Sequence, residues 1–158
     1  AATPDLVSAW QDATLVLGNQ LPPDRPGRAS SCHYHIELNA VDLALHMASR
    51  FTKTQLPLDF YHDLLDIADD EARHFFMFNN RLANLSSVYG NLPAHDGPWQ
   101  AADATKHNLP ACLAIAPLAL ETYGLDVTPT MIDRLKSVGY KETANALGII
   151  MADEITHL

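Results

Sequence analysis

Two short motifs constrain the fold of this chain more than any other feature of its sequence. Each consists of a glutamate and a histidine three positions later: Glu71 with His74, and Glu154 with His157. Residues i and i+3 of an α-helix lie on the same face, so each motif presents a carboxylate and an imidazole in one direction. A lone glutamate precedes each motif at a similar interval: Glu37 lies 34 residues before Glu71, and Glu121 lies 33 residues before Glu154. We therefore expect two similar helical hairpins whose polar groups face each other.

The hydrophobic periodicity favours an all-α protein, because strict alternation and hairpin dipeptides are scarce. Four long helical segments are expected, at residues 29–51, 58–85, 108–124 and 140–157. The connection at 89–99 is long and leads through a short polar helix into the third segment. The sequence therefore predicts a four-helix bundle with a long crossover between helices 2 and 3.

The ends of these segments carry residues that stop or start helices. Gly124 is expected to end the third segment, and a short extra helix is expected to begin between Asp126 and Pro129. Upstream of the bundle, residues 3–17 are predicted to form a short leading helix. The proline-rich stretch 21–28 is predicted to be a linker, since it cannot be helical throughout.

The four long helices carry the ligands that a pair of divalent metal ions requires. A glutamate from each of two helices and a Glu-x-x-His motif from each of the other two is the ligand set of di-iron and di-manganese bundles. The candidate metal ligands are Glu37, Glu71, His74, Glu121, Glu154 and His157. The chain has only five glutamates, and four of them belong to this set. Their helix neighbours are apolar, and an unpaired buried carboxylate there costs several kcal/mol. Chance or structural ion pairing explains one such motif easily, whereas two matched copies favour metal binding.

Three further residues are candidates to lie directly behind the ligands. Asp70 and Asp153 each stand immediately before the glutamate of a motif. Metal-bound histidines usually donate their second ring N–H to a carboxylate, so these aspartates are expected to hold the histidines. Tyr34, one turn before Glu37, is a candidate phenol beside the metals, and core packing is the more common alternative.

Two neighbouring features have open alternatives. Arg73 either orders Asp70 or an acidic neighbour, or forms a simple surface ion pair. The stretch 92–99 either caps the metal site or is a turn-rich crossover packed by Trp99.

Longer stretches of the sequence resemble a known family. The motifs DExRH at 70–74 and DExxH at 153–157 resemble the ferritin-like superfamily of O2-activating di-iron carboxylate proteins. More closely, HIELNAVDLAL, FYHDLLDIADDEARHF, YGNLPAHDGPW and GLDVTP are similar to the ferritin-like family DUF455, itself distantly similar to the tRNA hydroxylase MiaE. The likeness covers roughly residues 33–158. It implies a ferritin-like four-helix bundle with the six ligands above, and a pairing of each aspartate with the histidine of the opposite motif.

Length and charge limit the remaining possibilities. A chain of 158 residues predicts a single domain over 1–158. The resemblance implies that this domain is ferritin-like, with the di-metal bundle at 29–158. The net charge of −9 disfavours nucleic acid, which is bound through clustered lysines and arginines. No apolar run approaches the roughly 20 residues of a membrane span, and residues 1–10 lack a signal-peptide pattern. Cys32 and Cys112 fit no zinc or redox spacing, so a cytoplasmic protein with reduced cysteines is expected.

These observations favour an oxidoreductase in which two metal ions activate O2 and oxidise a small or tethered organic substrate. The metals are expected to be Fe, with a mixed Mn/Fe pair or Mn as alternatives. A ferroxidase or metal-storage protein is the second hypothesis, and a metal-stabilised structural or binding module is the third. A homodimer is compatible with the sequence, and an RNA substrate would need a basic surface that the sequence lacks.

Overall fold

The computed structural model describes residues 27–90, 97–115 and 121–157. Within these ranges all regular structure is helical, which confirms the all-α prediction. The elements are α2 (Gly27–Arg50), α3 (Leu58–Asn84), α4 (Gly97–Thr105), α5 (Leu109–Leu113), α6 (Glu121–Ser137), α7 (Lys141–Glu154) and the 3-10 turn η2 (Ile155–His157). The leading helix predicted at 3–17 lies outside the described residues. Of the predicted linker 21–28, only the last two residues are described, and they begin α2.

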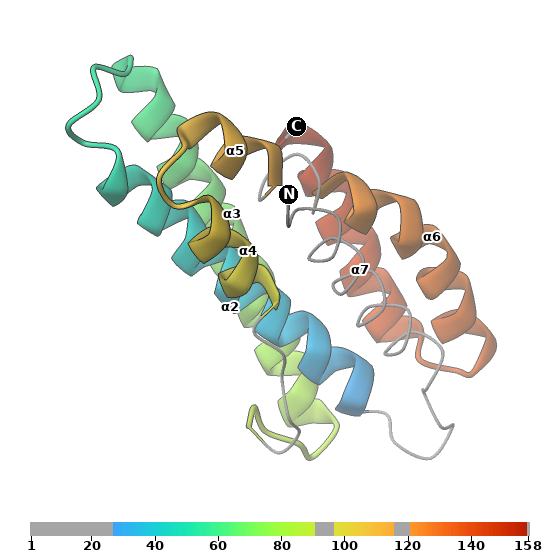
Figure 1. The fold of residues 1–158 in the computed structure, drawn as a ribbon. Helices are drawn as coiled ribbons and strands as arrows, with labels where there is room; N and C mark the ends of the chain where they lie inside the picture. The colour runs from blue at the N-terminus through green and yellow to red at the C-terminus, as the bar shows by residue number, and fades with distance from the viewer. Residues whose placement is uncertain (1–26, 91–96, 116–120, 158) are drawn as a thin grey trace.

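The long helices form two hairpins (Figure 1). Helices α2 and α3 pack against each other along their lengths, and so do α6 and α7. Contacts between α3 and α7 join the two hairpins, and α4 packs on α2. No helix in the described part of the chain is long and apolar enough to cross a membrane.

A continuous apolar core joins all four long helices. It combines side chains that come from α2, α3, α6 and α7: Tyr34, Phe78, Leu82, Ile132, Leu135, Ala144, Leu147 and Ile150. A second, smaller cluster joins Met47 of α2 and Leu64 of α3 with Cys112 of α5. Glu37 on α2, and Glu71 with His74 on α3, fall between these two apolar clusters.

The buried face of α3 includes polar residues in its normal helical register. Its buried positions are Leu64, Ala68, Glu71, His74, Phe78 and Leu82, spaced three or four residues apart. This spacing is that of one face of an α-helix, so the packing of the apolar residues also buries the carboxylate and the imidazole. The same register on α7 buries Leu147 and Ile150 and turns Glu154 toward α3.

The prediction that a helix ends at Gly124 and a separate helix begins near Asp126 is wrong. Helix α6 runs without interruption from Glu121 to Ser137 and contains both Gly124 and Pro129. A glycine ends a helix by adopting positive φ, and in this hairpin Gly139 does so, at φ 90°. The Thr128 hydroxyl donates to the Gly124 carbonyl at 2.7 Å, which gives this part of the helix a hydrogen bond beside the proline.

Candidate metal centre

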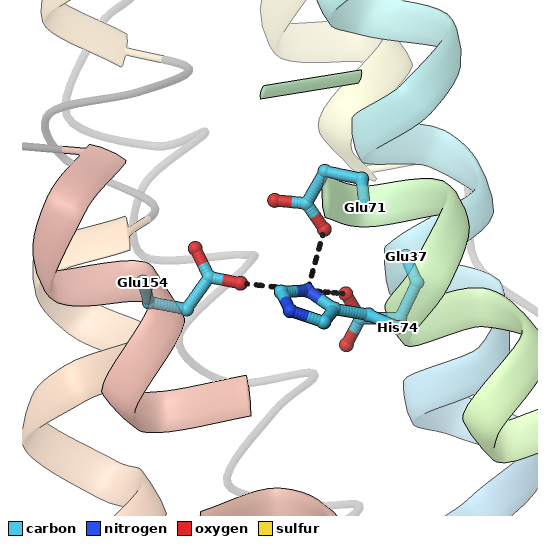
Figure 2. A group of neighbouring side chains, drawn as sticks. All are labelled: Glu37, Glu71, His74 and Glu154. Carbon is cyan, nitrogen blue, oxygen red and sulfur yellow. Dashed lines mark ion pairs between the residues drawn. The ribbon is translucent and has the colours of Figure 1, made fainter. Parts of the chain in front are cut away.

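His74 lies at the centre of a group of carboxylates that come from three helices (Figure 2). Its Nδ1 atom is 3.3 Å from Glu154 Oε1, 3.5 Å from Glu71 Oε2 and 3.7 Å from Glu37 Oε2. One ligand atom from each of these four side chains lies within 4.8 Å of all the others. Three carboxylates and an imidazole nitrogen at this separation can hold a metal ion.

The cluster is buried and two of its atoms have unmet bonding capacity. Glu37 is 5% exposed, Glu71 is 1% exposed and His74 is fully buried. Among the described side chains, His74 Nδ1 and Glu71 Oε1 are buried polar atoms without a hydrogen-bond partner. Leaving such an atom unsatisfied costs about 1–3 kcal/mol. A cation beside His74 Nδ1 would satisfy that nitrogen, and a cation beside Glu71 Oε1 would satisfy that oxygen, so the residues present fit metal ions.

The second motif continues the cluster on its other side. His157 Nδ1 is 2.7 Å from Glu154 Oε2 and 3.4 Å from Glu71 Oε1. His157 itself lies in the 3-10 turn that follows α7, and the i and i+3 residues of such a turn still share a face. Glu71 and Glu154 therefore each direct one oxygen toward His74 and the other toward His157. In this arrangement both carboxylates could contribute ligand atoms to metal ions held beside either histidine.

The sixth predicted ligand is only partly described. Glu121 is the first residue of α6, and its side chain lies outside the described part of the structure. The structure thus brings five of the six predicted ligands together, and the position of the Glu121 carboxylate stays a prediction.

The two aspartates lie behind the histidines, each on the side away from the carboxylates. Asp153 Oδ2 is 3.2 Å from His74 Nε2, and Asp70 Oδ2 is 3.3 Å from His157 Nε2. Each aspartate thus meets the histidine of the opposite motif. An Nε2–H that donates to the aspartate leaves the Nδ1 lone pair free to face a metal.

Without a bound cation, protonated imidazoles balance the carboxylates. Burial disfavours the charged form of His74, yet its contacts with the three glutamates outweigh burial and raise its pKa to about 12. Contacts with Glu154 and Glu71 raise the pKa of His157 to about 11. Burial alone would raise the pKa of Glu71, but the two histidines lower it to about 2. Burial raises the pKa of Glu37 well above its usual value, so this carboxyl group also favours its protonated form.

These pKa values predict that metal uptake releases protons at neutral pH. A histidine must be neutral to coordinate a metal through Nδ1. With these pKa values, both imidazoles of the metal-free cluster are in the protonated, cationic form at pH 7. Binding of two ions should therefore release about two protons from the histidines, with a further contribution from Glu37. Calorimetric titration with Co(II) in buffers of different ionisation enthalpy measures this number. Release of no protons would contradict histidine coordination.

Tyr34 and Trp99, the last residue of the predicted cap, both pack against aromatic rings. The Tyr34 ring packs on Phe75 and Tyr89, at centroid distances of 4.1 and 4.5 Å, within the apolar core. Trp99 makes an edge-to-face contact with His46, at a centroid distance of 5.6 Å. Residues 92–96 of the crossover lie outside the described part of the chain, so a cap over the site stays a prediction.

Sequence reasoning missed one contact of the site. Arg73 pairs with Asp70, which either of its predicted alternatives allows, and it also approaches Asp153 on α7. The spacing of Asp70 and Arg73 indicates the first contact, because the two residues lie three positions apart on one helix. No sequence signal indicates the second contact, which depends on how α3 and α7 pack.

Comparison with known proteins places the chain among relatives of unassigned activity. Residues 3–158 match the family described as "Protein of unknown function (DUF455)". A protein of Haemophilus influenzae, described as an uncharacterized protein, is 34% identical over 166 residues. That alignment covers 98% of this chain and 58% of the relative, so the chain spans little more than half of the relative's length. No solved structure matches the chain.

Proposed function

Because this chain belongs to the DUF455 family, a family of unknown function, we propose a function from its own site: a di-metal carboxylate oxidoreductase that activates O2. In this proposal the fold is a ferritin-like four-helix bundle, and the substrate is a small or tethered organic molecule. The metals are two Fe ions, with Mn/Fe or Mn pairs as alternatives. The protein acts in the cytoplasm, where reducing conditions maintain Fe(II).

One observation carries the proposal. Glu71 and Glu154 each approach both imidazoles with separate oxygens, at 2.7–3.5 Å from the Nδ1 atoms. A structural ion pair needs only one carboxylate for each histidine, whereas a metal pair needs carboxylates that reach both ions. The chemistry that such a pair supplies when bound is the reductive activation of O2 close to a substrate.

The residues of the chain have separate roles in this proposal. The proposed ligands are Glu37, Glu71, His74, Glu121, Glu154 and His157. Asp70 and Asp153 accept hydrogen bonds from the Nε2 atoms and thereby fix the orientation of the rings. The apolar clusters around Phe78 and Met47 lie beyond the site along the bundle axis and limit the access of water from both directions.

Anaerobic loading with Fe(II) followed by exposure to air tests the proposal. We expect the reduced, loaded protein to consume O2 in proportion to bound iron and to gain near-ultraviolet or visible absorption. The Zn(II)-loaded protein is the matched control, because Zn(II) has no redox chemistry and should show neither change. An Fe(II)-loaded protein that consumes no O2 and keeps its spectrum would overturn the oxidoreductase.

The same experiment separates the alternative functions. Oxidation of many Fe(II) ions per chain would indicate a ferroxidase or a store. Metal binding without any reaction with O2 would indicate a structural role for the metals. Neither alternative has a specific observation in its favour, so we rank both below the oxidoreductase.

A further inference from the structure

We propose that Arg73 is a positioning residue that holds both histidines of the metal centre through the two aspartates. This inference rests on the proposed metal centre and adds a residue that connects the Glu71/His74 motif with the Glu154/His157 motif. One guanidinium group, on α3, contacts Asp70 on its own helix and Asp153 on α7. Arg73 thereby connects the two aspartates that lie behind the histidines.

The contacts form an unbroken chain from one imidazole to the other. His157 Nε2 is 3.3 Å from Asp70 Oδ2, and the other oxygen of Asp70 pairs with an Arg73 nitrogen. The second terminal nitrogen of Arg73 lies 3.7 Å from Asp153 Oδ2. That same Asp153 oxygen is 3.2 Å from His74 Nε2. Every link of this chain joins groups of opposite charge or a donor with an acceptor.

The chemistry of this position requires arginine. A guanidinium is a planar fork with five donors, so it can meet two carboxylates at once, whereas an ammonium is a point charge. The corresponding position of the second motif is Thr156, whose hydroxyl donates to the Asp153 backbone carbonyl at 2.7 Å. In this geometry the Thr156 hydroxyl is committed to the backbone rather than to the Asp153 carboxylate. Arg73 is therefore the residue that contacts the aspartates of both motifs.

Exposure explains why the aspartates need such a partner. The side chains of Asp70 and Asp153 are 30% and 32% exposed, so water competes with the histidines for their oxygens. Asp70 meets His157 through one oxygen and Arg73 through the other, so the guanidinium fixes the side of the carboxylate that the imidazole does not hold. Removal of the guanidinium would leave both carboxylates free to turn toward solvent and away from the imidazoles.

Two variants of Arg73, with Co(II) as the probe, test the inference. Arg73→Gln removes the charge and the fork, and Arg73→Lys keeps the charge alone. The Arg73 side chain is exposed to solvent, so both variants should fold. The control is Glu142→Gln, which removes a different α3–α7 ion pair, with Arg81, far along the helices from the histidines. Visible d–d absorption of bound Co(II) reports ligand geometry, and titration gives affinity.

We expect Arg73→Gln to bind two Co(II) ions with a shifted d–d spectrum. Changes to residues behind the ligands cost about 10–100-fold in affinity, and Arg73 lies one contact further out, so we expect a loss of about 3–10-fold. Arg73→Lys should recover only part of this loss, and Glu142→Gln should match the wild type in spectrum and affinity. A spectrum and affinity of Arg73→Gln equal to the wild type would overturn the inference, as would full recovery by lysine. If the wild-type protein binds no Co(II), the proposed metal centre itself fails, which is a separate result.

Discussion

Glu71→Gln is expected to abolish the stable binding of both metal ions. Glu71 directs Oε2 toward His74 and Oε1 toward His157, so one substitution weakens both halves of the site. Glutamine has the same shape but lacks the charge, and its amide nitrogen would face one of the metals. Changes to residues behind metal ligands already cost about 10–100-fold, so the loss of a shared ligand should exceed about 100-fold in affinity. Metal content after desalting and calorimetric titration with Co(II) measure the effect.

Glu142→Gln is the matched control for this experiment. It makes the same chemical change on α7, at a side chain that is 74% exposed and paired with Arg81 outside the cluster. The control should bind two ions with wild-type affinity. Circular dichroism checks that Glu71→Gln remains helical. Retention of two tightly bound ions by a folded Glu71→Gln would contradict the proposal that Glu71 is a ligand shared by both ions.

The parts of the site that follow from local geometry are predictable from the sequence. Glu71 and His74 share a helical face with Leu64 and Phe78, so the period of the apolar residues indicates that both are buried. The contact of His157 with Glu154 follows in the same way from their spacing. The boundaries of α2 and α3 also lie within two residues of the predicted segments 29–51 and 58–85.

The parts that depend on how helices pack are not predictable in this way. Asp153 and His74 are 79 residues apart in the sequence, and spacing alone gives no reason to pair them. The resemblance to a family implies that pairing, whereas nothing in the sequence implies the contact of Arg73 with Asp153. The error at Gly124 has a related cause. A glycine is only a permissive helix end, and here the packing of Ile132 and Leu135 on α7 favours a continuous α6.

In the proposed di-metal protein, removal of the metals is expected to lower the melting temperature by about 10–20 °C. A ligand at 100 times its dissociation constant stabilises the folded state by about 2.7 kcal/mol, so two ions contribute about 5 kcal/mol. For a chain of this size, 1 kcal/mol corresponds to about 2–4 °C. Melting of the wild-type protein with Co(II), and again after addition of a chelator, measures the difference. Glu71→Gln is the control, and its melting temperature should not respond to either addition.

The difference in melting temperature should also widen as pH rises from 6 to 8. The pKa values of His74 and His157 are raised to about 12 and about 11, so their contribution to the metal-free protein is fully present below about pH 6.5. That contribution falls as pH rises toward 11, because the folded state then holds protons that the unfolded chain has lost. The affinity for metal rises with pH instead, because each ion must displace protons from its ligands and these protons are easier to remove at higher pH. Equal melting temperatures with Co(II) and with chelator at both pH values would show that protons, rather than metal ions, neutralise the buried carboxylates.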